Sequence, residues 1–135
     1  MGDLSKHFDR HEFACSCCDY FRLDPRLLTS LEELRFIGGE QPIYVLSGYR
    51  CAKRNKEIGG AELSYHLFGK AADIRIKGLT LNQMYSWARR VGAFDQGGIG
   101  VYPAENFIHV DVRGYLSRWA RVNGKYVGLD EVGMA

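Results

Sequence analysis

The chain has 135 residues, of which 46% are hydrophobic and 25% are charged, a composition typical of one globular domain with one core. Its formal net charge is only +2 and its basic residues are scattered, which argues against a nucleic-acid-binding protein. No apolar run is long enough to cross a bilayer, so we expect no membrane partner. The first residues lack the apolar stretch of a signal peptide, so we expect synthesis in the cytoplasm unless a leader has been lost.

The first predicted elements are helices. Residues 9–12, DRHE, have the form of a capping box and predict a short helical turn that leads into Phe13. Residues 24–39 predict a longer helix that begins at Asp24 and ends at a pair of glycines. Four leucines of this helix recur every three or four residues, which indicates one apolar stripe facing the core.

The middle of the chain predicts a strand, a short helix and a second strand. Residues 42–47, PIYVLS, predict a short buried strand because β-branched and aromatic residues favour that environment. Residues 51–59 predict a short helix that ends at a glycine. Polar and apolar side chains alternate in residues 71–76, AADIRI, which places Asp73 and Arg75 on one face and the isoleucines on the other.

A second strong helix and a hairpin come next. Thr80 and Gln83 have the spacing of a capping box, and we expect Gly92 to close the helix that they begin. Two strand patterns follow, at residues 97–102 and 106–112. The short connection between them predicts an antiparallel hairpin.

The last predicted element is a hairpin within ARVNGKYV, whose Asn-Gly pair at residues 123–124 suits a type I′ turn. The elements together predict an α+β fold in which helices pack on a mostly antiparallel sheet. We expect residues 1–135 to form a single domain.

Three of the four cysteines, Cys15, Cys17 and Cys18, lie in the motif CSCC, and the fourth is Cys51. Without a signal peptide, such clustering indicates metal or redox chemistry more than a disulfide framework. Adjacent Cys17 and Cys18 can hardly pair with each other without strain. Three interpretations stay open, namely structural thiols, a disulfide to Cys51, and a second metal site.

Two polar motifs have the spacing of metal ligands. His66 precedes Asp73 by seven residues, and His109 lies on the same face as Asp111 in the apolar strand pattern FIHVDV. A catalytic zinc site commonly takes three ligands from His, Asp, Glu or Cys and leaves one position for water. Each motif alone is more typical of ordinary hydrogen-bonded residues. If the strands of Asp73 and His109 are neighbours, however, three ligands can converge on one ion.

Residues 47–76, SGYRCAKRNKEIGGAELSYHLFGKAADIRI, and residues 97–113, GGIGVYPAENFIHVDVR, resemble the zinc D-Ala-D-Ala carboxypeptidase family. The family pattern is Ser-x-His-x6-Asp, preceded by an SGYR-type segment and followed by a later histidine. The family includes DD-carboxypeptidases, vancomycin-resistance dipeptidases, murein endopeptidases and phage endolysins, and it shares its fold with the hedgehog signalling domain. The resemblance runs from about residue 8 to about residue 122. It points to the short branch with the HVD ending, which is common in phages and their hosts.

The resemblance implies a single zinc peptidase-like domain of the hedgehog/DD-peptidase type, with zinc as its cofactor. Arg50 matches a position that binds a substrate carboxylate or a developing oxyanion, so it is expected both to bind substrate and to take part in catalysis. The implied zinc ligands are His66, Asp73 and His109, and the implied substrate contacts are Ser64, Arg50 and Tyr49.

The chain departs from the family pattern at the general base. Several relatives carry Glu or Asp three residues before the final histidine, where this chain has Asn106. Glu105 is adjacent, but in a regular strand it would point to the other face. Asp111 shares the face of His109. We therefore expect Asp111 to act either as the base or as a partner that orients a ligand.

The predicted function is that of a zinc-dependent peptidase that cleaves peptidoglycan stem peptides with zinc-activated water, as a DD-carboxypeptidase or as a murein endopeptidase of the endolysin type. The alternative is a zinc-bearing, non-catalytic murein-binding or signalling module, which Asn106 keeps open. We expect a monomer whose partners are peptidoglycan peptides. It would act on the cell wall after release by a phage or carriage on a virion.

Overall fold

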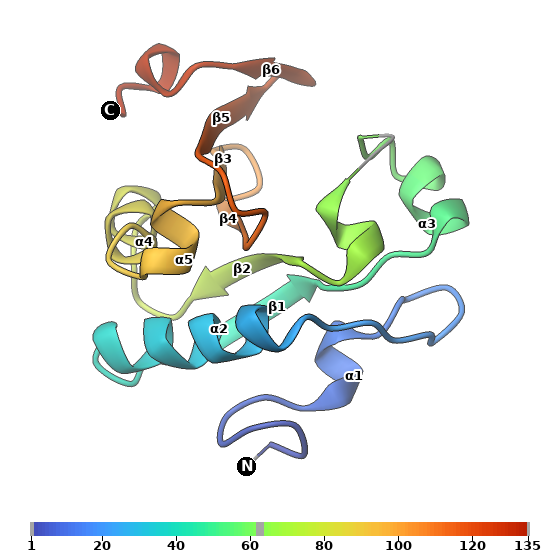
Figure 1. Cartoon of the computed structure of the whole chain (residues 1–135). Coiled ribbons are helices and arrows are strands. Elements are labelled where there is room, and N and C mark those ends of the chain that lie inside the picture. The colour runs from blue at the N-terminus through green and yellow to red at the C-terminus, as the bar shows by residue number, and fades with distance from the viewer. Residues whose placement is uncertain (1, 62–63, 135) are drawn as a thin grey trace.

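One six-stranded sheet forms the centre of the computed structural model, which describes residues 2–61 and 64–134 (Figure 1). The strands are β1 (Ile43–Ser47), β2 (Ala71–Ile76), β3 (Gly98–Tyr102), β4 (Phe107–Asp111), β5 (Ser117–Val122) and β6 (Lys125–Val127). Their order across the sheet is β1-β2-β4-β3-β5-β6, and all neighbours run antiparallel except β3 and β5, which run parallel. The predicted α+β fold with a mostly antiparallel sheet is confirmed.

Helices pack against one face of the sheet at β3 and β4. The helices are α1 (Arg10–Phe13), α2 (Pro25–Ile37), α3 (Ala52–Glu57), α4 (Leu81–Ala88) and α5 (Gly92–Asp95), with 3-10 turns η1 (Tyr65–Phe68) and η2 (Leu129–Val132). Helices α4 and α5 pack against β3 and β4, and α2 packs against both of these helices. Figure 1 shows α4 and α5 on one side of β3 and β4, whereas α3 lies on the opposite side.

Capping hydrogen bonds confirm the predicted starts of α2 and α4. The Asp24 carboxylate accepts from the Arg26 N–H at 2.9 Å, and Pro25 occupies the first turn of α2. At α4, Thr80 and Gln83 cap each other, because each backbone N–H donates to the side chain of the other residue. Local sequence therefore fixes where both long helices begin.

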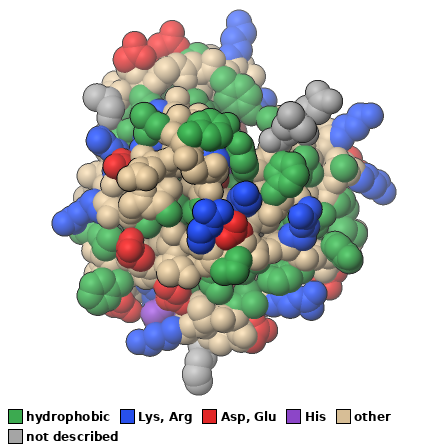
Figure 2. Space-filling view, in the orientation of Figure 1, with side chains coloured by type: hydrophobic (Ala, Val, Ile, Leu, Met, Phe, Trp, Pro, Cys, Tyr) green, Lys and Arg blue, Asp and Glu red, His purple; other side chains and the backbone are tan. Residues whose placement is uncertain are grey.

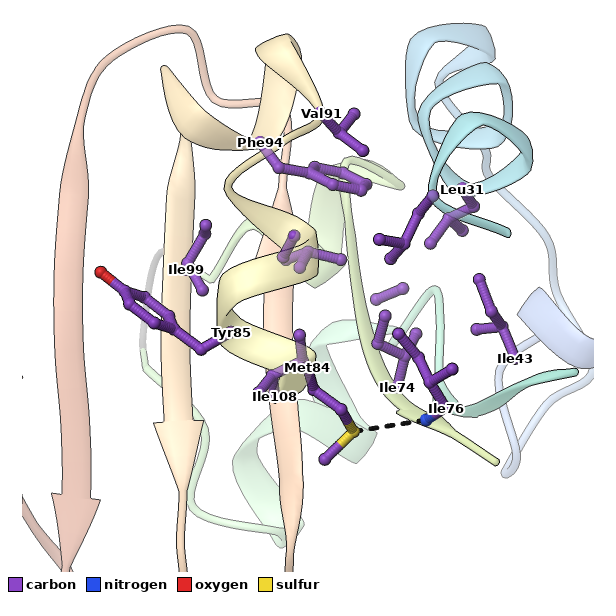
Figure 3. Packing of buried hydrophobic residues seen from close by; sticks show 14 of the residues in the cluster. Leu31, Ile43, Ile74, Ile76, Met84, Tyr85, Val91, Phe94, Ile99 and Ile108 are labelled. Atoms are coloured by element: carbon purple, nitrogen blue, oxygen red, sulfur yellow. Dashed lines mark hydrogen bonds between the residues drawn. The ribbon is translucent and has the colours of Figure 1, made fainter. Parts of the chain in front are cut away.

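The hydrophobic core lies between the sheet and these helices. Ile74 and Ile76 of β2 and Ile108 of β4 point toward it together with Met84 of α4 (Figure 3). The Met84 sulfur also accepts a hydrogen bond from the Ile76 N–H at 3.3 Å. Because successive side chains of a strand point to opposite faces, the polar residues next to these isoleucines in the sequence lie on the opposite face of the sheet.

Two expectations about elements are wrong. The strand expected to be buried, β1, is an edge strand, and its Tyr44 and Leu46 are 47% and 45% exposed. Among the residues that the structure describes, it pairs with β2 alone, so one of its sides has no neighbouring strand there. Gly92 does not close α4, which ends at Ala88; it begins α5, which carries Phe94 into the core.

The surface carries no sign of a broad basic patch on the face that Figure 2 displays. There, Lys and Arg side chains are distributed among hydrophobic and acidic side chains. This agrees with the net charge of +2. Within residues 2–61 and 64–134, no helix combines the length and apolar character that a membrane span requires.

Candidate metal centre

Three polar side chains converge on the face of the sheet opposite α4 and α5. Asp73 of β2 and His109 of β4 are direct cross-strand partners, and His66 reaches them from η1. The Asp73 Oδ1 lies 3.2 Å from His66 Nε2 and 3.2 Å from His109 Nδ1. Potential ligand atoms of all three residues lie within 4.8 Å of one another. The condition set by the sequence analysis, that the strands of Asp73 and His109 are neighbours, is met.

In each histidine, the ring nitrogen that points away from Asp73 makes a hydrogen bond. This bond determines which of the two ring nitrogens keeps a lone pair. His66 Nδ1 lies 2.7 Å from the Gly48 carbonyl oxygen, which can only accept, so Nδ1 donates and Nε2 keeps its lone pair. His109 Nε2 lies 2.7 Å from the Asp111 carboxylate, so it donates, which in the neutral ring leaves the lone pair on Nδ1. Both free nitrogens face Asp73. Histidines that bind metals are characteristically held in this way by a carbonyl or a carboxylate.

The charges of the cluster favour a cation. Burial would raise the pKa of Asp73, but His66 and His109 hold it well below its usual range, so Asp73 is ionised. Burial lowers the pKa of His66 and favours its neutral, ligating form. Burial also acts to lower the pKa of His109, but the hydrogen bonds with Asp111 and Asp73 outweigh it and raise that pKa. Two imidazole nitrogens and one carboxylate form a donor set that fits zinc.

Asp111 lies behind His109 and has no access to solvent. Its carboxylate accepts from His109 Nε2, from the Gly98 N–H at 2.8 Å and from the Arg113 guanidinium at 2.7 Å. Burial alone would raise the pKa of Asp111, but His109 and Arg113 hold it well below its usual range. Of the two roles expected for Asp111, these contacts support that of a partner that orients His109.

Two glycines of β3 make room for this arrangement. A Cβ atom at Gly98 would collide with the Asp111 carboxylate, and one at Gly100 would collide with the Trp119 indole. Gly100 is the cross-strand partner of both His109 and Trp119. The GGIGVY segment therefore carries glycine on the site face and apolar side chains on the core face.

The cluster opens into a cleft of about 750 Å³ that holds aromatic and cationic side chains. Arg50 borders this cleft, with its Nη2 3.5 Å from Ser64 Oγ. The Arg50 Nε is buried and has no hydrogen-bond partner among the residues that the structure describes. An unpaired, buried guanidinium nitrogen beside a cleft indicates a place for an anionic or carbonyl group. The cleft is lined by Arg50, Ser64, His66, Asp73, His109, Tyr65, Tyr102, Glu105, Phe107, Arg113, Tyr115, Trp119, Arg121 and Tyr126, among others.

Tyr49 is not among the cleft-lining residues that the structure describes. It lines the neighbouring cavity, which Cys15, Cys17 and Cys18 also line, and its ring lies 6.4 Å from that of Tyr20. The structure therefore brings together Arg50, Ser64 and the three expected metal ligands but leaves Tyr49 outside the cleft.

Asn106 lies in the turn between β3 and β4. Its backbone has φ of 56°, a left-handed conformation that asparagine and aspartate tolerate better than glutamate does. Arg75 fixes this turn by donating to the backbone oxygens of Glu105 and Asn106 at 2.8 and 3.0 Å. Glu105 lies in the turn and not in a regular strand, so strand alternation does not govern it, and it lines the cleft.

Sequence reasoning missed several cleft residues. Arg113 continues the alternation of His109 and Asp111, a signal that could have placed it on the same face. Its guanidinium lies over the rings of Tyr65, Tyr115 and Trp119 at 4.4, 5.4 and 5.1 Å from their centroids. No local pattern brings these aromatic residues together, because they come from η1, β5 and the loop before β5.

Comparison with known proteins places this geometry among peptidases. A family model described as Peptidase M15 matches residues 6–111. The peptidoglycan L,D-endopeptidase MepK of Escherichia coli (strain K12) is 37% identical over 95 residues, which cover 66% of this chain and 50% of that protein. The probable peptidoglycan L,D-endopeptidase MepK of Haemophilus influenzae is 37% identical over 108 residues, 75% of this chain and 56% of that protein.

A more distant relative is the zinc D-Ala-D-Ala carboxypeptidase of Streptomyces albus G, which is 34% identical over 76 residues. The match covers 56% of this chain and 29% of that protein. The chain thus spans about half the length of the L,D-endopeptidases that it matches.

Proposed function

Since the chain belongs to the peptidase M15 family, we propose that it is a zinc-dependent peptidase that cleaves peptidoglycan stem peptides. The observation that carries this proposal is the pair of histidines whose free nitrogens both face an ionised Asp73 beside a large cleft. Residues 1–135 act together as one peptidase domain, since the described residues share one core. Its place of action is the cell wall.

His66, Asp73 and His109 hold the zinc ion in this proposal. A zinc ion with three protein ligands keeps a position open for water, lowers the pKa of that water to about 7 and polarises a carbonyl group. Asp111 keeps the His109 ring in place and keeps its Nδ1 free by accepting the Nε2 proton. The Gly48 carbonyl does the same for His66 through Nδ1.

Arg50 binds the negative charge of the substrate. Its free Nε and its planar guanidinium can receive a stem-peptide carboxylate or the oxygen of the peptide carbonyl under attack. Ser64, at 3.5 Å from Arg50 Nη2, limits the orientations of this side chain and borders the same cleft. Both residues lie within reach of the substrate rather than of the core.

Glu105 is the proposed proton carrier. Among the cleft-lining residues that the structure describes, it is the acidic one outside the metal cluster, and it is exposed. An exposed carboxylate can exchange protons with water and with a leaving amine, whereas buried Asp111 cannot. Arg75 supports this role because it fixes the backbone of the turn that carries Glu105.

The L,D-bond of crosslinked stem peptides is the first candidate for the scissile bond, because the relatives that share 37% identity are named as L,D-endopeptidases. A terminal D-Ala-D-Ala bond is the second, from the Streptomyces albus G relative. The cleft supports neither over the other. A non-catalytic murein-binding module would use the same cleft without turnover.

Product analysis tests the proposal. The purified, zinc-loaded chain is incubated with L,D-crosslinked dimers, D,D-crosslinked dimers and pentapeptide monomers, and the products are identified by liquid chromatography with mass spectrometry. We expect cleavage of the L,D-crosslinked dimer and none after chelation. Binding of these muropeptides with no cleavage of any would establish the non-catalytic module instead.

A further inference from the structure

The four cysteines lie together although Cys51 is far from the others in sequence. Cys15 Sγ lies 3.6 Å from the Sγ atoms of both Cys17 and Cys51, and the Sγ atoms of Cys17 and Cys51 lie 3.2 Å apart. With Cys18 included, all four sulfur atoms lie within 4.8 Å of one another. None of them belongs to the cleft cluster described above, which takes its donors from His66, Asp73 and His109.

The sulfur separations match a metal site better than a disulfide. Four sulfur atoms at about 2.3 Å from a tetrahedral zinc ion lie about 3.8 Å from one another, whereas bonded sulfur atoms lie about 2.0 Å apart. The measured separations of 3.2 and 3.6 Å are much nearer to the first value. Three sulfur atoms are also mutually close here, whereas a disulfide joins only two.

We propose that Cys15, Cys17, Cys18 and Cys51 bind a second zinc ion as four thiolates in a closed, structural site. Four thiolate ligands leave no open position, so this ion stabilises the fold and does not activate water. The exposed Cys17 and Cys18 give the ion a path from solvent, and Cys15 forms the buried side of the site.

The backbone around the cysteines is arranged for thiolates. The Cys51 N–H donates to Cys15 Sγ and the Arg54 N–H donates to Cys51 Sγ, both at 3.4 Å. The CSCC segment folds back on itself through two backbone hydrogen bonds. The Cys15 N–H donates to the Tyr20 carbonyl oxygen at 2.7 Å, and the Asp19 N–H donates to the Cys15 carbonyl oxygen at 2.8 Å. This tight turn directs three sulfur atoms toward Cys51.

The proposed ion would fix the loop that supports the cleft. Residues 48–51 contact the N-terminal segment on one side, where the Tyr49 N–H donates to the Phe13 oxygen at 2.8 Å. On the other side of the loop, the Gly48 carbonyl holds His66 and the Arg50 N–H donates to the His66 oxygen at 3.2 Å. A cross-link between Cys51 and the CSCC segment therefore restrains the backbone next to both Arg50 and His66.

Metal content per chain is the primary test and needs no substrate, so its outcome is independent of the proposed peptidase activity. We expect about two zinc ions in the wild type, about one in Cys17→Ser/Cys18→Ser and about one in His66→Ala/His109→Ala. Ser16→Ala, in the same turn, is the matched control and should keep both ions. One ion in the wild type with none in His66→Ala/His109→Ala would overturn the proposal.

Two measurements on the wild type avoid any dependence on how the variants fold. After exchange with cobalt, we expect sulfur-to-cobalt charge-transfer absorption, which the cleft cluster without sulfur cannot give. An organomercurial titrant should release one zinc ion per chain as the four thiols react. A reduced protein whose thiols react with no release of zinc would contradict the proposal, and so would an intact mass lower by two hydrogens, which indicates a disulfide.

Discussion

The two clusters of side chains that could hold a metal ion differ in how they are built and in what surrounds them. The cleft cluster has three donors of mixed type, of which the two histidines are each oriented by a second residue, and it opens into a cleft of about 750 Å³. The cysteine cluster has four donors of one type, three of them from a single turn. An incomplete, supported donor set suits chemistry, whereas a complete set of thiolates suits stability. Changes in the cleft cluster should therefore remove activity.

The largest expected effect is that of His109→Ala. This change removes one ligand and leaves the Asp111 carboxylate without its histidine partner. We expect loss of the cleft zinc and a fall in turnover of about 10³-fold or more, because the charge stabilisation supplied at the metal is lost. Zinc content and muropeptide cleavage measure both. His11→Ala, an exposed histidine outside the cleft, is the control; full zinc occupancy in His109→Ala would remove His109 from the ligand set.

Glu105→Gln should have the second largest effect on turnover, and zinc content should be unchanged. Loss of the proton carrier should lower turnover by about 10²–10⁴, the usual contribution of general acid–base catalysis. The same change at Glu33, which is exposed on α2, should have no effect. Equal turnover in Glu105→Gln and wild type would show that this carboxylate carries no proton in the rate-limiting step.

Asp111→Asn tests the distinction between orienting a ligand and transferring a proton. Asparagine keeps the shape but loses the charge that His109 and Arg113 face. We expect zinc affinity to fall by about 10–100-fold, with activity restored by excess zinc. Zinc titration followed by assays at saturating zinc separates the two roles. Low turnover that persists at full zinc occupancy would assign Asp111 the role of the base.

Arg50→Lys should have the smallest effect of the four. Lysine keeps the charge but lacks the planar fork that matches a carboxylate in two contacts. We expect both zinc ions to remain and kcat/KM to fall by about tenfold, about 1.4 kcal/mol of transition-state stabilisation. Arg26→Lys on α2 is the matched control. Unchanged kinetics in Arg50→Lys would place Arg50 outside the substrate site.

Much of the fold could be predicted because its signals are local. The caps of α2 and α4 and the alternation in β2 and β4 depend on neighbouring residues, and each is present in the structure. The sequence placed Asp73 and His109 on the polar faces of their strands, whereas the pairing of these two strands was only a condition, which β2 and β4 meet. The edge position of β1 is a property of the whole sheet, so the apolar PIYVLS segment alone suggested a buried strand.

The site was predicted less completely because parts of it depend on tertiary contacts. The role of Asp111 became distinguishable only when its bonds to Gly98 and Arg113 were known. Glu105 was assigned to the wrong face because a regular strand was assumed where a turn occurs. That the four cysteines lie together could not be predicted from the sequence, because it depends on the turn before Tyr20 and on the loop after β1.

Removal and return of zinc in the wild type tests the central claim most directly, namely that His66, Asp73 and His109 hold the ion that peptide cleavage requires. A chelator is used at a concentration that removes the cleft ion, zinc content is measured, and muropeptide cleavage is assayed before and after zinc is restored. The account predicts that cleavage is lost with the ion and returns with one equivalent of zinc. Undiminished cleavage by protein whose cleft contains no metal would contradict it.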